Sequence, residues 1–157
     1  MDVYKKLKEM NIALPQAPGL GGEYNQVLPF GDSGSLAYVS GTGPCVEEGA
    51  QFAGKLGVQY TLEEGREAAR CAVLNMLAVI EKNVGDLNRI KRFVKLLCFI
   101  ASDNEFYQQP QVADAASALL IEIFGEDIGR SARSAIGVNV LPHNIPFEVE
   151  AIIELKV

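Results

Sequence analysis

The amino-acid sequence predicts an α+β fold in which helices cover one face of a mostly antiparallel sheet. A long segment over residues 61–85 repeats apolar side chains with the period of a helix, and a second segment over 112–124 does the same. Several shorter runs alternate between apolar and polar residues, as half-buried strands do. Apolar helix stripes and an apolar sheet face bury each other, so we expect the helices and the sheet to pack as layers.

The composition is typical of one globular domain. The chain has 157 residues, of which 48% are hydrophobic and 22% charged. We interpret residues 1–157 as a single domain, with residues 1–20 as an N-terminal helical extension. The formal net charge of −6 argues against nucleic-acid binding, which needs clustered cations to displace counterions from phosphates.

The sequence also indicates where the protein works. No segment is apolar over the roughly 18 residues that a membrane span needs, and the N-terminus lacks the apolar run of a signal peptide. We therefore expect no membrane association. Three widely spaced cysteines without a Cys-x-x-Cys pair are typical of a reducing compartment, which predicts a cytoplasmic location.

The first part of the chain predicts one short helix and two or three strands. Residues 3–10 space their apolar side chains for one helical face, whereas residues 14–22 are rich in Pro and Gly and should be irregular. Alternation predicts strands, and turn-forming residues predict a loop between them. The ranges are 26–29, 35–40 and 54–59 for the strands and 40–49 for the loop.

The middle of the chain predicts a long helix, a strand and a second helix. Thr61 is placed to cap the long helix, Glu64 completes a capping box, and Gly85 ends the helix. Residues 90–100 follow as a strong strand candidate. Pro110 suits the first turn of the second helix, and Gly125 can close it.

The end of the chain carries the most informative pattern. Two alternating runs, 132–140 and 147–155, flank a proline-containing break and predict two antiparallel strands joined by a loop. In the second run, alternate residues from Phe147 to Leu155 form the core face. The opposite face carries Glu148, Glu150, Ile152 and Glu154. In the first run we place Ile136, Val138 and Val140 on the core face, and Arg133, Ala135, Gly137 and Asn139 on the other.

A hairpin between these strands has consequences for any site. A tight turn would put Arg133 opposite Glu154 and leave Glu148 roughly 20 Å away, at about 3.3 Å per residue. Arg133 and Glu148 could then meet only between subunits. Because Ile152, Ala135 and Gly137 would lie on the face without helices, oligomerisation is the simplest way to cover that face.

This region resembles the C-terminal signature of the Rid/YjgF family, the reactive intermediate deaminases also called L-PSP endoribonucleases. The signature is an Arg-Ser pair, then Leu-Pro, then an apolar-Glu-apolar-Glu-Ala strand. Here it reads Ala132-Arg133-Ser134-Ala135, Leu141-Pro142 and Phe147-Glu148-Val149-Glu150-Ala151. Upstream, Tyr24 and the Ser40-Gly41 pair are similar to the family's tyrosine and serine-glycine positions, and the order of elements agrees.

The resemblance implies a chorismate-mutase-like fold assembled as a homotrimer, with a ligand cleft at each subunit boundary. It implies hydrolysis of reactive imines and enamines to a keto acid and ammonia, without a cofactor or a metal. Arg133 and Glu148 would be catalytic: the guanidinium fork suits a substrate carboxylate, and the glutamate could orient a water or move its proton. The implied substrate-binding residues are Arg133, Tyr24, Ser40, Gly41 and Ala135.

Other functions remain open at this point. The protein could be a trimeric binder that holds a small carboxylate metabolite in the same clefts without turnover. The older family label suggests a ribonuclease, which the acidic charge disfavours.

Simpler interpretations also exist for individual residues. Arg133 could be an ion-pair partner of Glu150 or Glu154, and Glu148 could be a solvated strand residue. Tyr24 and Ser40 could pack in turns. No cation or base lies near Cys45 in the sequence, so we interpret it as an inert thiol, and we interpret His143 as an exposed loop residue.

Overall fold

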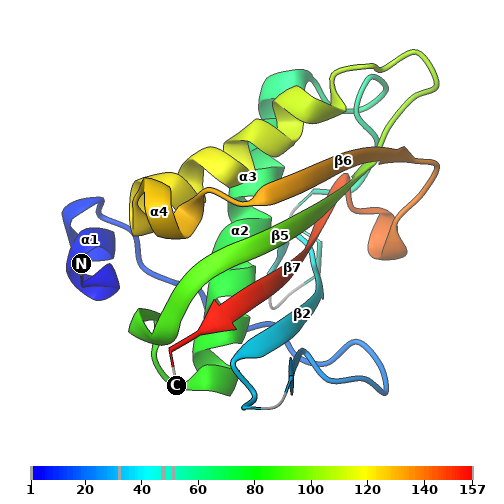
Figure 1. The fold of residues 1–157 in the computed structure, drawn as a ribbon. Coiled ribbons are helices and arrows are strands. Elements are labelled where there is room, and N and C mark those ends of the chain that lie inside the picture. Colours follow the sequence, from blue (N-terminus) through cyan, green and yellow to red (C-terminus); the bar gives the residue numbers. More distant parts are fainter. Residues whose placement is uncertain (1, 32, 47–48, 51, 157) are drawn as a thin grey trace.

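The chain folds into a five-stranded sheet with helices packed on one face, in a computed structural model that describes residues 2–31, 33–46, 49–50 and 52–156 (Figure 1). The helices are α1 (Val3–Glu9), α2 (Leu62–Val84), α3 (Gln109–Phe124) and α4 (Glu126–Gly129), with 3-10 turns η1 (Leu87–Arg89) and η2 (Pro142–Asn144). The strands are β1 (Val27–Phe30), β2 (Leu36–Thr42), β3 (Cys45–Val46), β4 (Gly49–Ala50), β5 (Ile90–Ala101), β6 (Ala132–Val138) and β7 (Phe147–Leu155).

The main sheet is mixed, with the strand order β1-β2-β7-β5-β6. Its pairs are antiparallel except β5 and β6, which run parallel. Strands β3 and β4 form a separate two-stranded sheet inside the segment predicted as a loop, where Glu47 and Glu48 lie outside the described residues. The predicted α+β class is confirmed.

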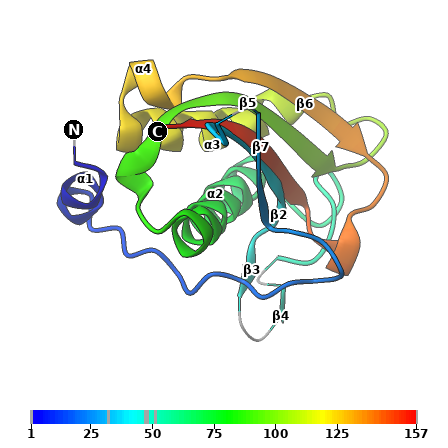
Figure 2. The same cartoon turned by 60° about the horizontal axis from the view of Figure 1, so that its bottom comes forward.

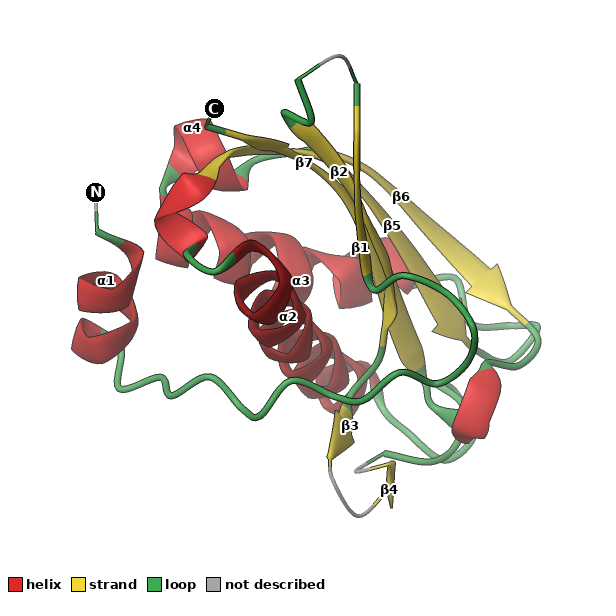
Figure 3. Cartoon of the chain, turned by 90° about the horizontal axis from the view of Figure 1, so that it is seen from below, coloured by secondary structure: helices red, strands yellow, loops and turns green. Residues whose placement is uncertain are grey.

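The long helix forms for the reasons that the sequence indicates. The Thr61 side chain accepts the backbone N–H of Glu64, and the Glu64 carboxylate accepts the N–H of Thr61 in return. Gly85 ends the helix with φ of 90°, a left-handed conformation that glycine adopts without strain. Helices α2 and α3 lie together against one side of the sheet, and α1 lies at their end (Figures 2 and 3).

The structure differs from the sequence prediction at residues 54–59 and just after Gly125. Residues 54–59 do not form a strand: Leu56 makes only isolated bridges with Tyr60 and Ser102. Helix α4, a single turn after Gly125, is not indicated by the sequence pattern. None of the described helices is long and apolar enough to cross a membrane.

The predicted hairpin at the end of the chain does not form. Strand β6 pairs in parallel with β5, which sets Arg133 beside Leu96, while β7 lies between β2 and β5. Glu154 therefore accepts from Lys91 and Arg92, not from Arg133. Alternation determines which side chains share a face, but it does not determine which strand pairs with which.

The predicted faces are right for β7 and inverted for β6. Phe147 and its alternate neighbours on β7 are buried. On β6, Ala135 and Gly137 pair with inward-facing residues of β5 and so face the helices, whereas Ile136 is 42% exposed. Helix α3 approaches this edge closely, since a Cβ on Gly137 would lie 2.8 Å from Nε2 of Gln109. A small residue is therefore required at Gly137, on the side where the sequence pattern suggested a polar face.

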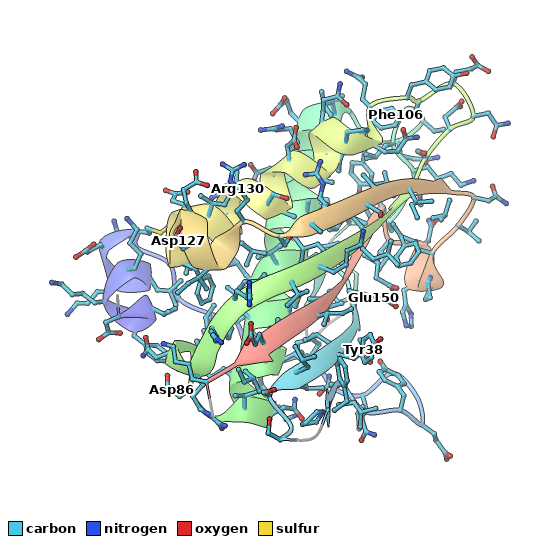
Figure 4. All side chains as sticks on the ribbon, viewed as in Figure 1. Tyr38, Asp86, Phe106, Asp127, Arg130 and Glu150 are labelled. Atoms are coloured by element: carbon cyan, nitrogen blue, oxygen red, sulfur yellow. The ribbon has the colours of Figure 1, made fainter. Side chains whose placement is uncertain are left out.

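The opposite face of the sheet carries apolar side chains that none of the described elements covers. The register pairs Tyr38 with Ile152, and Tyr38 is 52% exposed. Leu97 and Phe99 of β5 pair with Glu150 and Glu148 and lie on the same face. Figure 4 shows Tyr38 and Glu150 on neighbouring strands of this sheet. We call this surface the open face.

Candidate functional site

A cavity of about 1110 Å³ opens beside the end of β2. Its walls come from residues 15–21, the ends of β2 and β7, helix α2 and the loop at 142–145. The amide of Gln26 donates to the carbonyls of Pro18 and Gly19 at 2.8 and 3.4 Å, which holds the irregular N-terminal segment against the cavity. Figure 3 shows this segment running past α2 and β3.

Four of the predicted site residues line this cavity: Tyr24, Ser40, Gly41 and Glu148. The pairing of β2 with β7 shifts register between Val39 and Thr42, so Ser40 and Gly41 have no partner residue on β7. The Ser40 hydroxyl donates to the carbonyl of Asn25 at 2.7 Å and ties the Tyr24 segment to β2. This irregularity in the hydrogen bonding between β2 and β7 leaves Ser40 and Gly41 free to line the cavity.

Glu148 lies against Gly41 in a partly buried position. A Cβ on Gly41 would come within 2.7 Å of Cδ of Glu148, so only glycine leaves room for the carboxylate. Burial, and then the charge of Glu150, raises the pKa of Glu148. A carboxyl group with a raised pKa exchanges its proton nearer to neutral pH, as a general acid or base must.

Arg133 and Ala135 do not reach this cavity. The Arg133 guanidinium lies at the far edge of the sheet and donates to Asp114 at 2.9 Å, to Ser117 at 3.0 Å and to the carbonyl of Pro110 at 3.4 Å. The interpretation of Arg133 as a partner of Glu150 or Glu154 is therefore wrong. Because Arg133 points to the helix side and Glu148 to the open face, the two do not meet within one chain.

Several cavity residues escaped the sequence analysis. Asn75 of α2 lines the cavity, and only its polarity within an apolar helix stripe could have drawn attention to it. Cys45 also lines it, and burial, followed by the charge of Glu148, raises the pKa of this thiol, which keeps it protonated. His143 is exposed, as expected, and it also lines the cavity, with a positive φ of 56°.

The described residues include no group of three or more His, Cys, Asp or Glu side chains arranged to hold a metal ion.

Comparison with known proteins identifies the family. Residues 5–155 match the family model described as "YjgF/chorismate mutase-like, putative endoribonuclease". The chain belongs to the YjgF family. The resemblance seen in the C-terminal signature is thereby confirmed, and so is the chorismate-mutase-like fold.

Three similar proteins illustrate the range of this YjgF family. Protein TCP17 from Trypanosoma cruzi is 39% identical over 154 residues, which cover 98% of this chain and 94% of that protein. A 2-iminobutanoate/2-iminopropanoate deaminase from Dermatophagoides farinae is 29% identical over 146 residues, which cover 92% of this chain and 95% of that protein. The crystal structure of a "putative endoribonuclease" from Shewanella oneidensis superposes with a TM-score of 0.91 at 32% identity. The match covers 99% of this chain and 100% of that protein.

Proposed function

We propose that this YjgF-family protein hydrolyses reactive imines and enamines to a keto acid and ammonia, without a cofactor, in clefts between the subunits of a homotrimer. The observation that carries the proposal is Glu148, a carboxyl group with a raised pKa, in one cavity with Tyr24, Ser40 and Gly41. Family membership and the similarity to an imine deaminase support a Rid-like role.

A second subunit is needed because one chain supplies only half of the site. The described residues that line the cavity include no Lys or Arg to hold a substrate carboxylate. Arg133 lies at the sheet edge, with 20% of its side chain exposed. We infer that a neighbouring copy, docked on the open face, brings its Arg133 to the cavity that contains Glu148.

The reaction needs only a water molecule and one group that moves protons. Water attacks the imine carbon and gives a proton to Glu148, which passes it to the imine nitrogen as the C=N bond becomes a C–N single bond. Glu148 then takes the hydroxyl proton of the resulting carbinolamine and gives it to the nitrogen, so that the C=O bond forms as the C–N bond breaks and ammonia leaves. Arg133 of the neighbouring copy would hold the substrate carboxylate, and the backbone at Gly41 would admit the reacting atoms closely.

Two further expectations accompany the proposal. The net charge of −6 disfavours binding to the phosphates of RNA, so nucleic acid is not among the proposed partners. A cytoplasmic location, expected from the cysteine pattern, stays a prediction.

Release of ammonia and keto acid from imines, generated in the assay by an amino-acid oxidase, tests the proposed function. We expect release above the spontaneous rate from the parent protein and a loss of at least about 100-fold in Glu148→Gln. Arg133→Ala should lose keto-acid binding as well. Arg130→Ala is the matched control, because this exposed arginine directly follows α4 and, among the described residues, forms an ion pair with Glu126 of that helix. Figure 4 shows Arg130 beside α4, away from β7.

Mixing the two inactive variants tests the shared site directly. If one copy supplies Arg133 and its neighbour Glu148, about a quarter of the clefts in randomly mixed trimers would contain both residues and regain activity. Mixtures as inactive as their components would contradict a shared site. A parent protein that binds keto acids but releases no ammonia would instead be the carboxylate binder.

A further inference from the structure

Asn75 is a buried polar side chain that points at the cavity. It lies in the middle of α2 and is 4% exposed, among apolar neighbours on the same helix face. Buried polar groups normally satisfy their hydrogen bonds, because leaving a donor or acceptor unmet costs free energy. Asn75 also lines the cavity that contains Glu148. We therefore consider the hydrogen-bond partners of its amide nitrogen and of its amide oxygen in turn.

Both hydrogens of the amide nitrogen are used in hydrogen bonds. Nδ2 donates to the carbonyl of Gly43 at 2.9 Å and to the carbonyl of Cys45 at 2.7 Å. Both partners are pure acceptors, so a flipped amide would set its oxygen against two carbonyl oxygens. The orientation of Asn75 is thus determined, and Oδ1 faces away from this loop.

The amide oxygen is left without a donor from the described part of the chain. No described N–H or O–H donates to Oδ1, although Nδ2 makes two bonds. Among the described residues, Ser131 Oγ is the one fully buried side-chain oxygen or nitrogen without a hydrogen-bond partner. Oδ1 of Asn75 also has no described donor, so it is not fully buried. Because Asn75 lines the cavity, we infer that Oδ1 is an acceptor that faces it.

Asn75 and Glu148 lie on adjoining walls. The loop that Asn75 holds includes Cys45, which is close enough to Glu148 for its pKa to be raised by that charge. A Cβ on Gly43, the other residue held by Asn75, would lie 3.4 Å from the carbonyl oxygen of Phe147, next to Glu148 in the chain. Figure 3 shows the same loop, at β3, beside α2.

We propose that Oδ1 of Asn75 accepts a hydrogen bond from the N–H of the substrate imine or enamine and so distinguishes it from the keto-acid product. This inference rests on the proposed function. The substrate nitrogen carries a hydrogen to donate, whereas the product oxygen has only lone pairs, which an acceptor repels. An acceptor held in one orientation by two bonds cannot rotate to suit the product. The site therefore favours substrate and assists product release.

A matched pair of planar carboxylates provides the test. Pyrrole-2-carboxylate carries an N–H beside the carboxylate-bearing carbon, and furan-2-carboxylate has an oxygen there. We expect the parent protein to bind the pyrrole about tenfold more tightly, the size of one hydrogen bond. Asn75→Ala should abolish this preference. Val79→Ala, on the next turn of the same cavity wall, should change both affinities by the same factor and keep the preference.

The outcomes separate this inference from the proposed function. A preference that survives in Asn75→Ala, or equal binding of both carboxylates to the parent protein, overturns the role of Asn75 while leaving a carboxylate cleft. Failure of the parent protein to bind either carboxylate overturns both. If Asn75→Ala does not fold, a crystal structure of the parent protein with pyrrole-2-carboxylate decides: the N–H must point to Oδ1, and an N–H directed elsewhere contradicts the proposal.

Discussion

At the residue scale, Glu148 of the proposed site is a residue whose burial lowers stability at neutral pH. Its carboxylate is partly buried beside Gly41, and burial with the charge of Glu150 raises its pKa. A carboxyl group whose pKa is higher in the folded protein than in the unfolded chain favours folding most when it is protonated. That stability is present below the unfolded pKa and is lost as the pH rises through the folded pKa.

We therefore predict that Glu148→Gln stabilises the protein at pH 8 while removing turnover. The gap in melting temperature should open as the pH rises above about 4.3, the unfolded value for glutamate, because glutamine has no charge to bury. Thermal unfolding of both proteins between about pH 4 and 8 measures it. Glu122→Gln, at an exposed position of α3, serves as the control. Melting curves that shift equally at every pH would contradict the argument.

At the scale of elements, helix α2 connects local sequence signals to the site. Its capping box fixes the first turn, and Asn75 and Val79 in its middle form one wall of the cavity. The capping box at Thr61 therefore helps to position Asn75, although Asn75 lies 14 residues further along the helix. Strand β2 contributes in another way, because its register shift exposes Ser40 and Gly41.

We predict that Thr61→Ala lowers the free energy of unfolding by about 1 kcal/mol, the usual cost of losing an N-cap hydroxyl. The N–H of Glu64 would lose the acceptor that it has at 3.3 Å. Urea denaturation measures the change, and Thr61→Ser, which keeps the hydroxyl, should stay near the parent value. An unchanged denaturation midpoint for the alanine variant would show that the cap does not stabilise α2.

At the scale of the whole molecule, the open face is the feature that a single chain leaves unexplained. Tyr38, Ile136 and Ile152 lie on it together with Lys95 and the β7 glutamates. A sheet with one face on a helix layer and the other carrying apolar groups is typical of a subunit in an oligomer. The proposed trimer would cover this face and complete each cavity with Arg133.

We predict that Ile152→Glu prevents assembly of the proposed trimer, because it replaces an apolar side chain in the middle of the open face with a carboxylate between Glu150 and Glu154. Sedimentation velocity would show monomers, and keto-acid binding would be lost with the clefts. Val58→Glu, at a loop position that is 58% exposed, should keep the trimer. If the Ile152→Glu variant stays trimeric, the subunit interface lies elsewhere on the protein.

Much of the fold could be predicted from the sequence because its signals are local. The capping box at Thr61, the end at Gly85 and the buried face of β7 all depend on residues that are neighbours along the chain or share one period. The Arg133 and Glu148 signature identified the family in the same way. The sequence could not place Asn75 at the cavity, since nothing near it in the chain indicates a wall made by Gly43 and Cys45.

The sequence by itself determined the main helices and strands, the inward face of β7 and the family. Only the tertiary structure decided that β5 separates β6 from β7, that Arg133 turns toward α3, and that Tyr24, Ser40, Gly41 and Glu148 share one cavity. Periodicity is a property of a segment and can be read along the chain. The choice of a strand's partner depends on contacts between distant segments, which compete in free energy only when the whole sheet and its helices assemble.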